Sequence, residues 1–200
     1  MKEKKPIQSL LIKFYTVKDR ILHVGKRWDA QSVTKDTAID FAHKYINDEP
    51  SVMQNEYNYN LHYHLSHFGE CVNKNICSGY PDATDNCIIH MVAKNTTSVN
   101  LILYRGMDPS LFNLMRKDAQ IRSDCDLYEK GFLFCSLVKG AESRWQKRLR
   151  IFVPAGSKCV YQGDVNNEQA YYEVVVMTGA RLKIISIDSE YTNCMLMSTN

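Results

Sequence analysis

The spacing of apolar residues changes near residue 98 of this 200-residue chain. Before that position apolar residues recur every three or four places, which is the period of a helix with one buried face. After it, short apolar runs are separated by turn residues, which is typical of β-strands. The pattern therefore predicts one domain, with a mainly helical layer over residues 1–98 and a β core over residues 99–200.

Capping residues and apolar stripes predict four helices. They are expected to begin at Thr34 or Asp36, near Val52, at Asp82 or Asp85, and at Asp108-Pro109. The second is expected to run to Phe68 and to close at Gly69, because glycine favours the C-terminal end of a helix. The apolar stripe of the fourth helix consists of Leu111, Leu114, Met115 and Ile121.

Apolar segments bounded by turn residues predict six strands in the second part of the chain. They cover residues 99–105, 131–136, 149–153, 158–161, 172–177 and 181–187. Many short strands with tight turns favour a strongly bent pair of mixed sheets over a doubly wound parallel sheet. The predicted fold class is therefore α+β, with a split two-sheet mixed β core and an N-terminal helical layer.

Composition narrows the functional classes. The chain is 44% hydrophobic and 24% charged, and its net charge is +3, values that are ordinary for a globular protein. No stretch approaches the roughly 20 apolar residues that span a bilayer, and no secretory signal follows the basic start. The basic run 144–150 is short, and we interpret it as a solvated face or a contact to an acidic partner or an adenosine phosphate. We expect a soluble, cytosolic protein without a membrane or nucleic-acid partner.

The cysteines and histidines do not form a recognisable metal motif. The seven cysteines are an odd number without a C-x-x-C pair, so free thiols in a reducing cytosol are expected. A bacterial effector that acts inside another cell's cytosol fits the same count. His64 and His67 could share a helix face but lack a third ligand, and the spacing of Cys71, Cys77, Cys87 and His90 matches no compact zinc motif. We therefore expect no metal.

Three predicted strands each carry a chemically reactive residue at or near one end, namely Arg105, Ser136 and Glu173. If these strands are neighbours, the three side chains could converge on one cleft, and strand alternation would place Tyr171 on the side of Glu173. A guanidinium suits a pair of phosphate oxygens. A carboxylate can accept hydrogen bonds from a ribose and stabilise positive charge on the sugar as nicotinamide departs. The set therefore indicates NAD+ as the ligand and transfer of ADP-ribose as the reaction.

Each of these residues also has an ordinary structural interpretation. An arginine at a strand end is more often solvated or ion-paired than bound to phosphate. A single glutamate beside an apolar strand is usually a surface charge, and Tyr171 could fill a half-buried strand position. The functional interpretation depends on their order along the chain and not on any one of them.

That order resembles the Arg-Ser-Glu class of mono-ADP-ribosyltransferase toxins and effectors, over roughly residues 99–188. The matching segments are Tyr104-Arg105-Gly106, residues 131–137, residues 149–156 and residues 171–175. The resemblance implies a fold of the ADP-ribosyltransferase type with NAD+ as co-substrate. It implies catalytic roles for Glu173, Arg105 and Ser136, and an NAD-binding set of Tyr104, Arg105, Gly106, Phe134 and Ser136.

Two positions depart from the family pattern. Where the family usually carries Ser-Thr-Ser, this chain has Phe134-Cys135-Ser136. The hydroxyl that commonly braces the catalytic glutamate therefore falls on Phe134, which could stack on nicotinamide instead. Ser136 is the candidate for the bracing role. The second departure is Tyr171, which stands where arginine-modifying members have glutamate.

These departures bear on the acceptor. A phenol cannot deprotonate a guanidinium at neutral pH, so a Thr or Ser hydroxyl on a protein is the expected acceptor. The resemblance extends to effectors that modify a threonine of ubiquitin, which makes ubiquitin a candidate partner. Glu168, in the polar loop 163–170, is a candidate substrate-binding residue together with Tyr171. Two alternatives stay open: an NAD+ glycohydrolase, and a non-catalytic module that binds NAD+ or a protein.

Overall fold

The computed structural model describes residues 5–46, 61–162 and 171–200. Within these ranges the helices are α1 (Lys5–Leu22), α2 (Val24–Asp29), α3 (Ala38–Tyr45), α4 (Leu61–Ser78), α5 (Ala83–Lys94) and α6 (Pro109–Ala119). The strands are β1 (Leu101–Met107), β2 (Leu127–Glu129), β3 (Leu133–Ser136), β4 (Lys147–Val153), β5 (Cys159–Tyr161), β6 (Glu173–Val176), β7 (Ala180–Ile187) and β8 (Thr192–Ser198). The strands thus follow the helices α1–α5 along the chain, as the spacing of apolar residues predicted.

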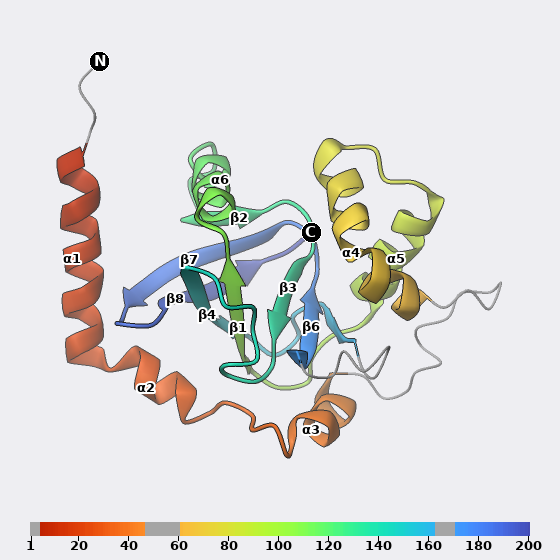
Figure 1. Cartoon of the computed structure of the whole chain (residues 1–200), viewed down its shortest axis with the longest axis horizontal. Helices are drawn as coiled ribbons and strands as arrows, with labels where there is room; N and C mark the ends of the chain where they lie inside the picture. Colours follow the sequence, from red (N-terminus) through yellow and green to blue (C-terminus); the bar gives the residue numbers. More distant parts are fainter. Residues whose placement is uncertain (1–4, 47–60, 163–170) are drawn as a thin grey trace.

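The strands form one mixed sheet in the order β2-β7-β8-β4-β1-β3-β6-β5 (Figure 1). All neighbouring pairs are antiparallel except β4 and β8, which are parallel. β1 pairs with β4 along its whole length. With β3 it shares a single paired position among the described residues, Tyr104 opposite Ser136. The α+β class is confirmed. The two sheets expected from the sequence are parts of one mixed sheet, joined where β1 meets β3.

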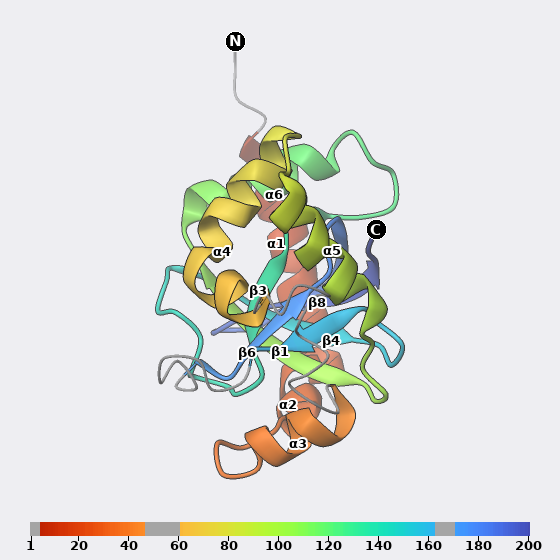
Figure 2. The same cartoon turned by 90° about the vertical axis from the view of Figure 1, so that its right-hand side faces the viewer.

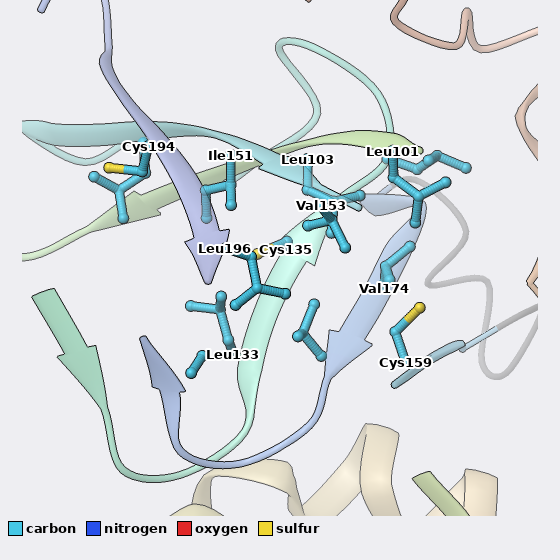
Figure 3. Packing of buried hydrophobic residues seen from close by; sticks show 14 of the residues in the cluster. Leu101, Leu103, Leu133, Cys135, Ile151, Val153, Cys159, Val174, Cys194 and Leu196 are labelled. Carbon is cyan, nitrogen blue, oxygen red and sulfur yellow. The ribbon is translucent and has the colours of Figure 1, made fainter. Parts of the chain in front are cut away.

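One large core holds the two parts together. It combines Leu127 of β2 and Leu182 of β7 with Leu133 of β3 and Val174 of β6, although these strands lie far apart in the sheet order. The sheet must therefore bend so that its ends share an interior, as the side chains in Figure 3 show for β1, β3, β6 and β8. Each such side chain contributes about 1.5–3 kcal/mol when fully buried.

A second core attaches α4 and α5 to the other face of β3 and β6 (Figure 2). Leu65 and Ile88 from the helices meet Phe132, which directly precedes β3, and Val175 of β6, and all four are buried. The helical layer expected from the sequence is therefore present over this half of the sheet. α1 instead packs against β7, and α6 against β2.

The helix starts were largely predicted correctly. α5 begins at Asp82, whose carboxylate accepts from the Asp85 backbone N–H, while Asp85 caps the Asp82 N–H in return. Both candidate residues thus take part in a single capping box. α6 begins after Asp108 as expected, but α3 is preceded by Thr37 and not by Thr34 or Asp36.

The predicted end of the second helix coincides with a break in α4, because the backbone at Phe68 is non-helical. A further helical segment, which the sequence did not predict, continues α4 to Ser78. A Cβ on Gly69 would lie 2.8 Å from the ring of Phe134. Glycine at this break therefore also allows the close approach of α4 to β3. The predicted stretch from Val52 to residue 60 lies outside the described residues.

Several elements and positions were not anticipated. The sequence pattern did not predict α1, α2, β2 or β8. Two members of the predicted α6 stripe, Leu114 and Ile121, are exposed, while Met115 is buried. None of the helices in the described ranges is both long and apolar enough to cross a membrane.

Candidate functional site

The strands that carry the three candidate residues are neighbours. β1, β3 and β6 are adjacent in the sheet (Figure 1), with Tyr104 opposite Ser136 and Ser136 opposite Glu173. Directly paired residues point to the same face of a sheet. Ser136 and Glu173 therefore share a face, which is the face covered by α4 and α5.

Gln162 joins this row from the other side. Tyr161 pairs with Val174, and the Gln162 backbone N–H donates to the Glu173 carbonyl over 2.9 Å. The register therefore places Gln162 opposite Glu173, on the same face. Its side chain is 4% exposed, and neither amide atom has a hydrogen-bond partner within the described structure. Sequence reasoning missed this residue because it offers no signal beyond following a predicted strand.

Arg105 lies at the point where β1 and β3 part. It follows Tyr104, so strand alternation places it on the face opposite to Ser136 and Glu173. Its Nη2 atom is 3.2 Å from Oε2 of Glu129, and both side chains are largely buried. Arg105 therefore lies on the other face of the sheet from Ser136 and Glu173, although their strands adjoin. Their convergence on one cleft stays a prediction.

The ion pair leaves part of the guanidinium unused. Nη1 of Arg105 is buried and has no hydrogen-bond partner among the described residues. A buried, charged donor of this kind normally has a partner. The free edge of Arg105 is therefore a suitable position for an anionic ligand group such as a phosphate oxygen.

The charges of Arg105 and Glu173 both influence the thiol of Cys135, which belongs to the strand between them, β3. Burial raises the pKa of Cys135 to about 12; the Arg105 charge opposes this rise, and the Glu173 charge adds to it. Cys135 therefore stays a neutral thiol at physiological pH. Arg105 and Glu173 are thus separated by one strand of the sheet.

The hydroxyl of Ser136 is engaged in a local turn. It donates to the carbonyl of Val138 over 2.8 Å and accepts from the Val138 N–H over 3.0 Å. Ser136 is also buried. This residue therefore holds the turn that follows β3 in place next to Glu173.

The backbone just before Glu173 is strained. Tyr172 has a φ of 48°, a left-handed conformation that bulky residues rarely adopt. β6 consequently begins at Glu173, and Tyr171 lies outside the strand with 52% of its surface exposed. The prediction that strand alternation places Tyr171 beside Glu173 is wrong, because the turn at Tyr172 breaks the alternation. Glu168 lies outside the described residues.

Several solved structures to which this chain is similar in fold are bacterial toxins. Plx2a, an ADP-ribosyltransferase toxin from Paenibacillus larvae, superposes with a TM-score of 0.62 at 14% identity, covering 84% of this chain and 98% of that one. The Clostridium limosum C3 exoenzyme gives 0.63 at 17% identity, with 82% and 96% covered. C3stau2 from S. aureus, solved with NAD, gives 0.57 at 14% identity, with 82% and 95% covered.

The fold is that of bacterial ADP-ribosyltransferase toxins. Identities of 14–17% show the fold and not the reaction. No protein-family model matches the chain, and no curated protein matches it either. The roles of individual residues must therefore be argued from this structure.

Within the ADP-ribosyltransferase fold, two of the expected NAD ligands have packing roles. Tyr104 is fully buried, and its hydroxyl donates to Oδ1 of Asp29 over 2.8 Å. Its side chain presents no surface to a ligand, so the expected ligand role of Tyr104 does not fit this position. A Cβ on Gly106 would lie 1.7 Å from the Ser143 carbonyl oxygen, so a crossing loop requires glycine there.

Phe134 is the residue at which the resemblance noted from the sequence implies a hydroxyl. Its ring lies against Gly69 of α4 and 6.5 Å from the ring of Phe132, edge to face. The side chain is partly buried and provides no hydrogen-bonding group. Phe134 thus presents an aromatic ring one row away from Glu173.

Two structural residues near the site were missed by sequence reasoning. Glu129 belongs to β2, a three-residue strand that the pattern did not predict. Asn73 of α4 donates to the Phe132 carbonyl over 2.9 Å and accepts from the Phe132 N–H over 2.7 Å. This paired contact fixes α4 to the start of β3.

A separate charged cavity of about 490 Å³ lies between α1, α2 and the segment before β8. Asp29 lines it, 2.7 Å from Nζ of Lys139 and 2.7 Å from Nε of Arg150. Burial raises the pKa of Asp29, but hydrogen bonds from Lys139 and Tyr104 outweigh it, so the pKa lies below its usual value. These mutual contacts indicate a network that fixes α2 to the sheet. Among the described residues no group of three potential metal ligands is found.

Proposed function

We propose that the protein is an NAD+–protein ADP-ribosyltransferase. The observation that carries the proposal is the row formed by Ser136, Glu173 and Gln162, together with the buried free edge of Arg105 on the adjoining strand β1. The chain that carries this row has the fold of the ADP-ribosyltransferase toxins. NAD+ is the co-substrate, and the fit rests on two buried polar groups, the Gln162 amide and Nη1 of Arg105, that lack hydrogen-bond partners among the described residues.

In this proposal Glu173 is the catalytic carboxylate. The bond between the nicotinamide nitrogen and C1′ of the ribose breaks, and its electron pair leaves with nicotinamide. The Glu173 carboxylate stabilises the positive charge that develops on the sugar. An acceptor oxygen then forms a bond to C1′ and loses its proton, which yields ADP-ribosylated protein.

Other residues would hold the dinucleotide. Nη1 of Arg105 would donate to a phosphate oxygen, while Glu129 keeps the guanidinium in place. Ser136 would support the turn beside Glu173, and Phe134 would offer its ring to nicotinamide. The buried Gln162 amide would hydrogen-bond to the ligand at Glu173.

We propose a Thr or Ser hydroxyl as the acceptor, with ubiquitin as the first protein to test. The exposed phenol of Tyr171 supports this choice, because it can position a hydroxyl but carries no charge to orient a guanidinium. The protein would then act as an effector in the cytosol of a host cell.

The decisive experiment is mass spectrometry of a host lysate and of purified ubiquitin after incubation with NAD+. The comparison includes wild type, Glu173→Gln and the matched control Glu70→Gln, which alters an exposed carboxylate on α4. Wild type and the control should add ADP-ribose to a protein, and Glu173→Gln should not. Equal modification by Glu173→Gln would overturn the assignment.

A second candidate is binding without catalysis. It is favoured by Phe134, which removes a hydroxyl from the site, and by the engagement of the Ser136 hydroxyl with Val138. Labelled NAD+ separates the possibilities: label on a protein identifies a transferase, free ADP-ribose a glycohydrolase, and intact NAD+ a binding module.

A further inference from the structure

The outer face of α1 is unusually apolar for an exposed helix. Of the fifteen large apolar side chains that are exposed in the described residues, seven belong to α1. They are Leu10, Leu11, Ile12, Phe14, Val17, Ile21 and Leu22. A contiguous exposed apolar patch of this kind marks an interaction site.

Four of these residues form one ridge. Leu10, Phe14, Val17 and Ile21 are separated by four, three and four positions, so they lie on one side of the helix. Each is more than half exposed. We call these four residues the α1 ridge.

The opposite side of α1 is attached to the protein. α1 packs along β7, and Oδ1 of Asp19 accepts from the Ser186 hydroxyl over 2.9 Å. Asp19 also accepts from the Gly25 backbone N–H. Figure 1 shows α1 at one edge of the molecule, beside β7 and β8 and remote from α4 and α5. The ridge is therefore held in a fixed orientation, facing away from the sheet.

Cations border the ridge on both sides. At 100° per residue, Lys13 and Arg20 fall on one side of the ridge and Lys18 on the other. Within residues 10–22 the sole acidic side chain is Asp19, which is on the attached side. An apolar stripe with basic borders is the pattern of a helix that lies in the interface of an anionic membrane.

We propose that α1 binds the surface of an anionic lipid membrane, with the α1 ridge inserted between the headgroups and the cations next to lipid phosphates. This would correct the expectation of no membrane partner. A second copy of the chain is the poorer occupant, because pairing two ridges would bring the basic borders of both helices together. The helix would lie flat, since it lacks the apolar length to cross a bilayer.

The test is sedimentation of the full chain with vesicles of phosphatidylcholine alone or mixed with phosphatidylserine. Wild type should bind the mixed vesicles, bind the neutral ones at least tenfold more weakly, and dissociate at high salt. Phe14→Asp/Ile21→Asp should lose binding at least tenfold. The control Leu114→Asp changes a similarly exposed apolar residue on α6 and should bind like wild type.

Three results would overturn the proposal. They are unchanged binding by the double variant, equal binding to neutral vesicles, and a dimer in light scattering that the double variant abolishes while neither protein binds lipid. Circular dichroism confirms that each variant is folded. The measurement needs no NAD+, so its outcome is independent of the proposed enzymatic activity.

Discussion

Gln162, which directly follows β5, lies opposite Glu173 of β6. Its buried side-chain amide has no hydrogen-bond partner among the described residues. Burying an amide without a hydrogen bond costs about 1–3 kcal/mol. The unsatisfied Gln162 amide beside the proposed catalytic carboxylate therefore lowers the stability of the folded protein. A ligand that satisfies the amide would recover this energy on binding.

Replacing Gln162 by leucine should therefore separate stability from ligand binding. We expect Gln162→Leu to leave the melting temperature unchanged or to raise it, because the unsatisfied amide is removed. The KM for NAD+ should rise by roughly tenfold, equivalent to about 1.4 kcal/mol, with a smaller change in kcat. Thermal unfolding and initial rates measure the two effects. An unchanged KM would show that the amide does not contact the ligand.

The ion pair between Arg105 and Glu129 should be important for stability. Both side chains are largely buried, so Glu129→Gln leaves an unpaired buried cation and should lower the free energy of unfolding by about 3 kcal/mol. Urea denaturation measures the change. The exposed pair of Arg181 and Asp124 provides the control, and Asp124→Asn should change stability by less than about 1 kcal/mol.

Removing both charges distinguishes a structural arginine from a ligand-binding one. Arg105→Met/Glu129→Gln should recover much of the stability lost in Glu129→Gln, because no unpaired buried charge remains. NAD+ binding, measured by calorimetry, should stay at least tenfold weaker than in wild type. Wild-type affinity in the double variant would exclude a phosphate contact for Arg105.

Acid should weaken the contacts that Asp29 makes with Lys139, Tyr104 and Arg150. The folded-state pKa of Asp29 lies below its unfolded value because its hydrogen bonds and Arg150 outweigh the effect of burial. The stabilisation is therefore complete above the unfolded pKa of about 4 and is lost as the pH falls through the lower, folded value. Urea midpoints should decrease from pH 5 downward. Asp29→Asn should be less stable at pH 7 and less sensitive to pH, whereas Glu70→Gln should follow wild type.

Two glycines should respond differently to alanine. At Gly106 the new Cβ would meet the Ser143 backbone carbonyl at 1.7 Å, so Gly106→Ala should prevent folding or strongly lower expression. At Gly69 the nearest atom belongs to the Phe134 ring, at 2.8 Å, and a side chain can move. Gly69→Ala should fold, with a melting temperature only a few degrees lower, as circular dichroism would show. Equal behaviour of the two variants would contradict these contacts.

The sequence was informative where the signals are local. Asp82 and Asp108 predicted helix starts because capping uses side chains within three residues of the backbone they bind. Short apolar runs located β1, β3, β4, β5, β6 and β7, since strand propensity and turns are short-range properties. The order of Arg105, Ser136 and Glu173 placed them on three strands that proved to be adjacent.

The composition of the site was decided by contacts between distant segments. Glu129 reaches Arg105 because the sheet bends and brings β2 over β1, and Gln162 reaches Glu173 through the register of β5 with β6. Tyr171 leaves the strand face because Tyr172 adopts a left-handed turn. Sequence alone determined which residues carry reactive groups and which short segments form helices and strands. Tertiary structure decided which faces those groups share, because sheet bending, register and a single backbone turn depend on packing across the whole fold.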